Sequence, residues 1–103
     1  MAWTIKVKHT RPNTDVEWYF GTSQLRGNGS SLTEKYINTG KRVSFNTSLS
    51  ENELELIKTI IWQDEAAKNE YWADSMVESW ISARNSYNAS NNISTVILQN
   101  EET

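Results

Sequence analysis

The sequence predicts a single α+β domain, residues 1–103, whose strands and helices follow the order β-α-β-β-α-β. Three observations carry this prediction. Polar and apolar residues alternate near the start and in the middle of the chain, which is the pattern of half-buried strands. Apolar residues recur at steps of three and four after residue 64, as on one face of a helix. A chain of 103 residues is long enough for one core and short for two.

The first strand is expected at "WTIKVKH", residues 3–9. Its alternation puts four residues on one face: Trp3, Ile5, Val7 and His9. The strand should end before Pro12, because proline lacks the backbone donor that a strand needs.

The helical region that follows is expected to be broken in two. "TDVE", residues 14–17, has the spacing of a capping box and predicts a short helix through Phe20. "SLTE", residues 31–34, repeats the spacing and predicts a second short helix that stops at Gly40. Between them lies the glycine-rich stretch "GNGSS", residues 27–31, which fits either a mobile lid over a pocket or an ordinary loop.

A strand hairpin is expected next. "KRVSFNTSL", residues 41–49, alternates and places four residues on one face: Val43, Phe45, Thr47 and Leu49. The stretch 53–62 has some helical spacing, but its β-branched residues favour a strand, with 50–52 as the turn. The adjacent apolar residues Ile60 and Ile61 indicate a central strand or a bulge near Lys58.

The last two elements are a helix and a strand. Asp64 should cap a single amphipathic helix that fades in the Asn-rich stretch 85–92. Five of its charged residues are expected on the solvent side: Lys68, Glu70, Asp74, Glu78 and Arg84. "ISTVILQ", residues 93–99, predicts the last strand, with an acidic tail over 100–103.

This order is ferredoxin-like: two βαβ halves share one antiparallel sheet, with the helices on one face. Apolar residues are expected on both faces of the sheet: Trp3, Val43, Phe45, Leu54 and Leu56, together with the last strand. A second copy of the chain is the economical cover for the free face. We therefore expect a homodimer through one sheet face.

Residues 41–80 resemble the corresponding half of the dimeric α+β barrel proteins of the antibiotic-biosynthesis-monooxygenase-like group. In that group a long strand ends in Trp, as at Trp62, and a short polar turn leads into a helix that begins with acidic and small residues. The resemblance implies a dimeric α+β barrel. That fold hosts monooxygenases, haem-degrading enzymes and isomerase-like proteins, so the fold does not select one activity.

"TRPNTDVEWYF", residues 10–20, together with the Asn-rich ending, resembles small proteins of marine T4-like bacteriophages. This second resemblance implies an origin, and hence a place in the host cytoplasm, but no mechanism.

The first resemblance also implies site residues. In its haem-degrading branch a His on the last helix holds the haem, and this chain has only His9, so we expect no haem. Its cofactor-independent monooxygenases hold an electron-rich aromatic substrate in the barrel pocket with a few polar groups. The corresponding pocket would be lined by Trp3, His9, Phe45 and Trp62, with His9 as the candidate catalytic base. A lone strand-end His is more often an ordinary residue at the solvent edge.

Composition excludes several classes of site. The absence of Cys and the single His leave no thiolate or two-imidazole metal site, and we expect no metal or cofactor. The net charge of −3 and the scattered basic residues argue against nucleic acid as a partner. No apolar run approaches the roughly 20 residues that span a bilayer, so we expect a soluble cytoplasmic protein without a membrane partner.

Three functions stay open. The first is a non-catalytic homodimeric accessory or binding protein, whose partner is a host protein or a small aromatic ligand. The second is a monooxygenase-like enzyme that acts on a small aromatic substrate, and the third is a virion or structural subunit. The sequence holds no evident catalytic constellation, which favours the first.

Overall fold

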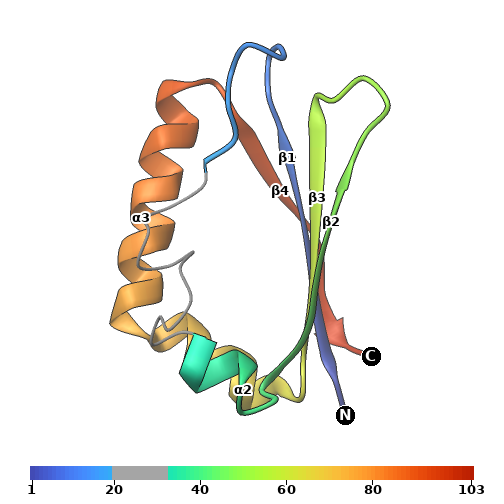
Figure 1. The fold of residues 1–103 in the computed structure, drawn as a ribbon, viewed down its shortest axis with the longest axis vertical. Helices are drawn as coiled ribbons and strands as arrows, with labels where there is room; N and C mark the ends of the chain where they lie inside the picture. Colours follow the sequence, from blue (N-terminus) through green and yellow to red (C-terminus); the bar gives the residue numbers. More distant parts are fainter. Residues whose placement is uncertain (20–32) are drawn as a thin grey trace.

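The computed structural model describes residues 1–19 and 33–103. Within them, four antiparallel strands form one sheet in the order β2-β3-β1-β4. The elements are β1 Trp3–Thr10, the π-helical turn η1 Thr33–Ile37, β2 Arg42–Leu49, β3 Glu55–Trp62, α2 Glu65–Ala73, α3 Ser75–Ser90 and β4 Ser94–Glu102. Both α-helices lie on the same side of the sheet (Figure 1). This is the α+β, ferredoxin-like arrangement that the sequence predicts.

The two central strands, β1 and β3, form as expected. Trp3 lies opposite Trp62 and His9 opposite Leu56, so the alternation predicted for β1 sets one face toward the helices. The hairpin between β2 and β3 closes through a hydrogen bond from Ser50 N to Glu55 O (2.9 Å). Glu53 completes the turn in the left-handed region with φ 62°. The strand interpretation of the stretch ending at Trp62 is therefore confirmed.

Two edge strands differ from expectation. A register shift between Arg42 and Ser44 takes Val43 out of the predicted alternation, and Val43 is 61% exposed. Arg42 lies on the helix side in its place. At the other edge, the stretch expected as an acidic tail belongs to β4, since Glu102 lies opposite Trp3. This pairing supplies hydrogen-bond partners for the backbone at the start of β1, on the side away from β3.

The helix predicted over 14–20 does not form in its described part, which ends at residue 19. Side chains bond the carbonyls that a helix would use: Arg11 donates to Val16 O (2.9 Å) and Tyr87 Oη donates to Glu17 O (2.6 Å). The helical turn predicted before Gly40 is present as η1, and Gly40 ends it with φ 79°. The stretch 27–31, and with it the choice between lid and loop, lies outside the described residues.

The single long helix predicted after Asp64 is two helices. Asp64 caps α2 through its bond from Ala67 N (2.8 Å), as expected. Asp74 then leaves helical geometry (φ −68°, ψ 126°) and caps α3 by accepting from Met76 N (3.0 Å). Its carboxylate also accepts from Tyr36 Oη (2.9 Å), so Asp74 faces the protein instead of solvent. No described helix is long and apolar enough to cross a membrane.

An aromatic cluster of Trp62, Tyr71 and Tyr36 packs the helices onto one end of the sheet. Trp62 is 0% exposed, and its ring lies 4.7 Å from that of Tyr71. Tyr36 meets Tyr71 edge-on at 5.2 Å and Trp62 edge-on at 6.2 Å. Such ring pairs add about 0.5–1.5 kcal/mol beyond the area that they bury. This cluster joins β3, α2 and η1 into one packed unit.

The dimer stays a prediction. Phe45 and Leu56 lie on the helix side, so the face of the sheet away from the helices is less apolar than expected. Alternation leaves Ile57, Ile61 and Val96 there, among Lys, Thr, Ser and Asn side chains.

We propose that this face pairs with a second copy of the chain, because its apolar groups are otherwise in contact with water. Sedimentation over a dilution series should show a dimer, and a monomer at micromolar concentration would contradict the pairing.

Candidate functional site

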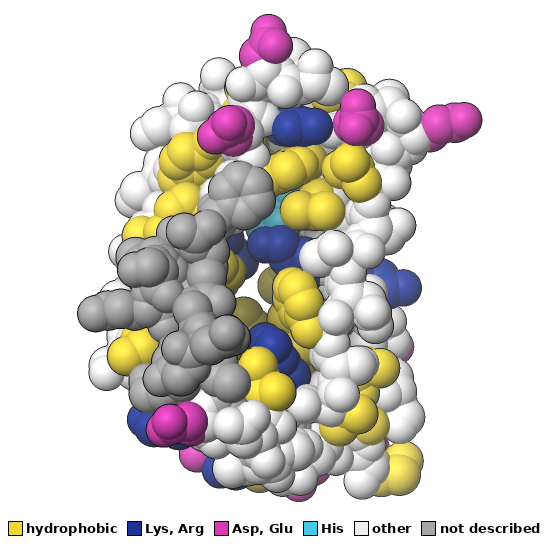
Figure 2. Space-filling view, viewed as in Figure 1, with side chains coloured by type: hydrophobic (Ala, Val, Ile, Leu, Met, Phe, Trp, Pro, Cys, Tyr) yellow, Lys and Arg dark blue, Asp and Glu magenta, His cyan; other side chains and the backbone are white. Residues whose placement is uncertain are grey.

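A cavity of about 500 Å³ separates the sheet from the helix layer. It appears in Figure 2 as a hollow bordered by hydrophobic and basic side chains. β1 and β3 supply one wall and α3 the other, with further residues from β2, η1 and α2. The lining residues are Ile5, Val7, Trp18, Tyr19, Tyr36, Ile37, Arg42, Phe45, Thr47, Leu56, Lys58, Ile60, Tyr71, Trp72, Val77, Trp80 and Arg84.

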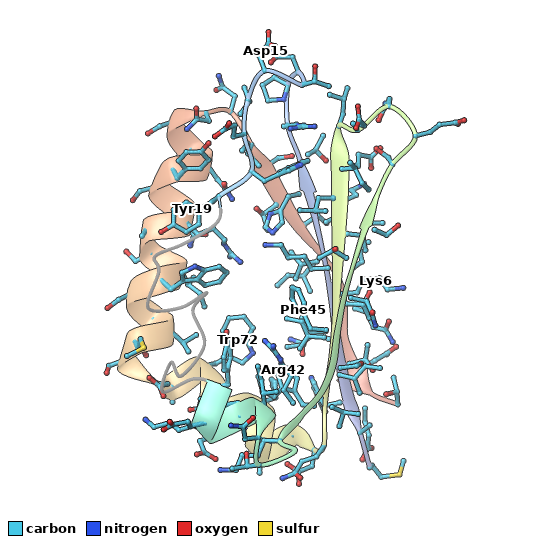
Figure 3. The ribbon with its side chains drawn as sticks, in the orientation of Figure 1. Lys6, Asp15, Tyr19, Arg42, Phe45 and Trp72 are labelled. Atoms are coloured by element: carbon cyan, nitrogen blue, oxygen red, sulfur yellow. The ribbon has the colours of Figure 1, made fainter. Side chains whose placement is uncertain are left out.

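Contacts between large aromatic side chains flank the cavity on two sides. At the end near α2 stands the cluster of Trp62, Tyr71 and Tyr36 described above. At the other end, the ring of Tyr19 lies 5.4 Å from Tyr87 and 6.2 Å from Trp80. Figure 3 shows Trp72 and Phe45 pointing into the space between helix and sheet from opposite sides. The cavity is the space between these two aromatic contacts.

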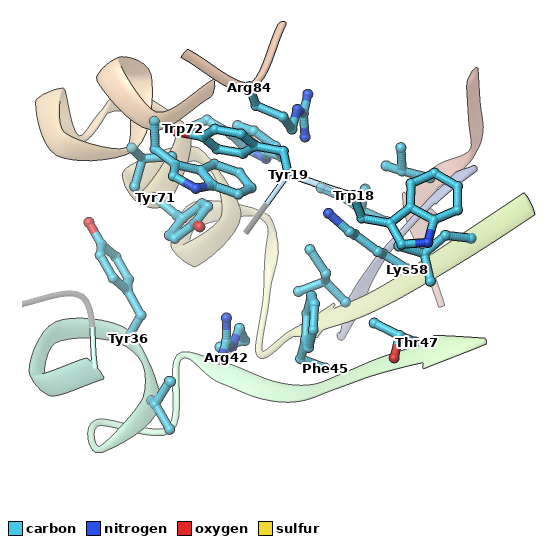
Figure 4. A pocket seen from close by; sticks show the side chains of 17 residues that line it. Trp18, Tyr19, Tyr36, Arg42, Phe45, Thr47, Lys58, Tyr71, Trp72 and Arg84 are labelled. Atoms are coloured by element: carbon cyan, nitrogen blue, oxygen red, sulfur yellow. The ribbon is translucent and has the colours of Figure 1, made fainter. Parts of the chain in front are cut away.

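Three cationic side chains reach the cavity wall from three elements: Arg42 from β2, Lys58 from β3 and Arg84 from α3 (Figure 4). Lys58 Nζ lies 5.8 Å and the Arg84 guanidinium 5.4 Å from the centre of the Trp80 ring. The Arg42 guanidinium lies 5.2 Å from that of Phe45. Aromatic faces attract cations, but they do not replace the hydrogen bonds of water.

Burial weakens the protonated form of these groups. Burial, together with the charge of Arg84, lowers the pKa of Lys58 to about 8. Burial also lowers the pKa of Arg42 and of Arg84. The Arg84 Nε atom is buried and has no hydrogen-bond partner within the described part of the chain. The site therefore holds positive charge that is only partly solvated.

Sequence reasoning missed these cations, and it placed Arg84 on the solvent side. A signal was present for two of them. Lys58 alternates with Leu56 and Ile60, so it shares their inward face. Arg84 follows Val77 and Trp80 at steps of seven and four, which puts it on their helical face. A long cationic side chain at such a position is usually assigned to solvent because its end can reach water.

His9 is buried, with 2% of its surface exposed, and the solvent-edge alternative is wrong. Its Nδ1 shares a hydrogen bond with Thr95 Oγ1 (2.8 Å), and its Nε2 has no partner among the described residues. A void of about 10 Å³, on the scale of one water molecule, lies beside it and shares Lys58 and Arg84 with the main cavity. Burial, and then the charges of Lys58 and Arg84, lower the pKa of His9 to about 4. His9 is therefore neutral at pH 7.

The four residues expected to line one pocket lie in three places. Phe45 lines the cavity, and His9 lines the small void next to it. Trp62 is in the packed cluster beneath the cavity and not on its wall. Trp3 packs against the same core, donates from Nε1 to Asn100 Oδ1 (2.6 Å), and lies 4.6 Å beneath Lys68 Nζ. A role in ligand binding stays a prediction for each of these four residues.

No group of three His, Asp or Glu side chains able to hold a metal ion occurs within residues 1–19 and 33–103.

Fold and cavity together define a ferredoxin-like α+β domain with a ligand-sized space between sheet and helices. The chain matches no protein-family model and no curated protein. Among solved structures it is similar to a protein of Deinococcus radiodurans proposed to be an antibiotic biosynthesis monooxygenase. That match has a TM-score of 0.50 at 12% identity, over 100% of this chain and 95% of the other. It is also similar to Rv0793 from Mycobacterium tuberculosis, with a TM-score of 0.47 at 13% identity, over 98% of this chain and 97% of that one.

At 12% identity, the match to the Deinococcus radiodurans protein is evidence of fold alone. It agrees with the fold group that residues 41–80 resemble. The resemblance to phage proteins stays a prediction.

The low pKa of His9 predicts a pH dependence of stability. The unfolded chain binds a proton near the ordinary pKa of 6.5 and the folded chain only near 4, so protonation favours unfolding between these values. The free energy of unfolding should therefore fall by about 2–3 kcal/mol as the pH drops from 6.5 to 4, and change little through this group above 6.5.

Urea unfolding of the wild type and of His9→Asn should show this slope in the wild type and a weaker one in the variant. Because His9 is the only His in the chain, the NMR signal of its ring protons reports the titration directly. A midpoint near 6.5 would contradict the buried, neutral imidazole.

Proposed function

We propose that this protein binds a small aromatic ligand in the cavity between the sheet and α3. The observation that carries the proposal is the cavity itself. Its volume of about 500 Å³ falls in the range of roughly 300–1,000 Å³ typical of small-molecule sites. Side chains would normally fill a space of this size, since protein interiors pack as densely as organic crystals.

The chemistry of the wall favours a flat, unsaturated ligand. Aromatic side chains enter the cavity from several elements, among them Trp18, Tyr19, Trp72 and Trp80. Rings of this kind stack on the ligand ring or meet it edge-on, while Ile5 and Ile60 supply an apolar floor. The cations and Thr47 give a few polar groups that would fix the orientation of the ligand. This agrees with the binding protein expected from the sequence.

A second candidate is a cofactor-independent oxygenase of electron-rich aromatic compounds. The observation that favours it is His9, a neutral imidazole beside the cavity whose Nε2 has no partner among the described residues. His9 would take a proton from an activated ring CH₂ group, and Lys58 and Arg84 would stabilise the resulting anion. The substrate then supplies all electrons: CH₂ and O₂ become C=O and H₂O, with no external reductant.

The binding proposal is tested by filling the cavity. Thr47→Trp puts a large ring at the cavity wall, and Ser48→Trp puts the same ring one residue further on, on the opposite face of β2. Calorimetric titration with 2-naphthol should detect binding to the wild type and to Ser48→Trp. We expect at least a tenfold weaker affinity in Thr47→Trp, which corresponds to about 1.4 kcal/mol. Equal affinities of the two variants for 2-naphthol would show that the ligand binds outside this cavity.

The oxygenase candidate is tested with anthrone as substrate. The wild type should convert anthrone to anthraquinone faster than buffer alone, with one O₂ consumed per product. His9→Asn should lower the rate by about 10²–10⁴, the usual contribution of a general base. A wild-type rate equal to the rate without protein, or an unchanged rate in His9→Asn, would remove this candidate and leave the binding function standing.

A further inference from the structure

The charge of the cavity wall narrows the class of ligand. Among the described residues that line the cavity, Arg42, Lys58 and Arg84 are basic and none is acidic. Residues 20–32 contain no Asp or Glu in the sequence, so they add no carboxylate wherever they lie. A buried cation without a counter-ion is expensive, because burial takes away its water.

The ion pairs of the described chain lie outside the cavity. Three ion pairs are present in this part of the protein, Lys8 with Glu55 (3.3 Å), Lys35 with Asp74 (3.4 Å) and Lys41 with Glu70 (2.8 Å). None of them includes a cavity cation. Within residues 1–19 and 33–103, ion pairs thus form at lysines outside the cavity, and the three cations of the wall are in none of them.

Lys58 and Arg84 converge on one place. Lys58 Nζ and the Arg84 guanidinium both lie within 6 Å of the centre of the Trp80 ring, and the charge of Arg84 contributes to the lowered pKa of Lys58. The two positive charges repel each other, and an anion bound between them would offset this repulsion. The only hydrogen bond described for the Arg84 guanidinium is a long one to Asn85 Oδ1 (3.3 Å). Its buried Nε has no hydrogen-bond partner among the residues that the structure describes.

Arg42 stands apart from this pair. Its guanidinium lies by Phe45, and the tyrosine that influences its pKa is Tyr71, in the aromatic cluster. Figure 4 shows Arg42 and Lys58 on separate parts of the wall. A single anionic group bound between Lys58 and Arg84 would therefore interact with two of the three cations at once.

We propose that the ligand is an aromatic carboxylate whose anionic group lies between Lys58 and Arg84 and whose ring lies against the aromatic wall. The inference rests on the binding function proposed above. A guanidinium presents two parallel N–H groups that match the two oxygens of a carboxylate, and an ammonium adds a third donor. Charge-assisted hydrogen bonds of this kind are shorter and stronger than those between neutral groups.

Three ligands with the same naphthalene ring test the proposal by calorimetric titration at pH 7: 2-naphthoate, the neutral 2-naphthamide and the cationic 2-naphthylmethylammonium. We expect naphthoate to bind at least tenfold more tightly than naphthamide, and the cation to bind most weakly. Equal affinities of naphthoate and naphthamide would overturn the carboxylate inference and leave the aromatic cavity intact. If none of the three binds, the binding function itself fails, and this inference with it.

Variants locate the anionic group. Lys58→Met and Arg84→Met should each lower the affinity for naphthoate about tenfold or more, with little change for naphthamide. Lys6→Met is the matched control, because Lys6 lies on the same sheet but on the face away from the helices (Figure 3). A naphthoate preference that survives both Lys58→Met and Arg84→Met would overturn the assignment. The wild-type comparison of ligands needs no variant and tests the charge preference alone.

Proton uptake gives an independent readout. Lys58 is partly neutral at pH 8.5, because its pKa in the free protein is about 8. A carboxylate beside it favours the charged form, so naphthoate binding at pH 8.5 should take up a fraction of a proton. This uptake appears as a dependence of the binding heat on the ionisation enthalpy of the buffer. It should be absent with naphthamide and with Lys58→Met, and no uptake by the wild type would contradict a carboxylate at Lys58.

Discussion

The packing of Trp62, Tyr71 and Tyr36 joins three elements at one end of the domain: the end of β3, the last turn of α2 and, from much earlier in the chain, the turn η1. Trp62 is fully buried in this contact, and the cavity lies next to it, lined by Tyr36 and Tyr71. The same rings thus stabilise one end of the domain and form part of the cavity wall. A smaller residue at Trp62 would leave a void in this packing and lower the stability of the domain.

At the other end of the cavity, the contacts are between residues that lie far apart in the sequence. Tyr87 donates to Glu17 O and packs on Tyr19, and Thr95 bonds the imidazole of His9. The contacts of Tyr87 join α3 to the segment that follows β1, and the bond between Thr95 and His9 joins β4 to β1 within the sheet. The basic residues occupy the gap between the two ends. A cavity of that composition is unfavourable for stability, since it combines lost packing with poorly solvated charge. Proteins tend to keep such features where they bind something.

The central strands were predictable because side chains alternate along a strand with a period of two, as β1 and β3 show, whereas a register shift interrupts the period in β2. Two of the failures involve partners far away in the chain. The sequence around Asp74 does not indicate that Tyr36 donates a hydrogen bond to it, yet that bond is made where α2 ends and α3 begins. The sequence around Glu17 likewise does not indicate that its carbonyl accepts a hydrogen bond from Tyr87. Strand alternation also placed Phe45 and His9 on the helix side, as the structure has them, whereas the cationic side of the wall depends on how α3 lies.

The break at Asp74 decides which charges face the cavity. In one continuous helix, a residue seven positions after Tyr71 would share its inward face, and that residue is Glu78. The break changes the phase, so Val77 is buried and Glu78 is exposed. Seven positions after Val77 comes Arg84. An unbroken helix would have turned a carboxylate toward Lys58 and Arg84 toward solvent, and the wall would have been largely neutral. The cap at Asp74 is thus a determinant of the electrostatics of the site, although it lies outside the cavity.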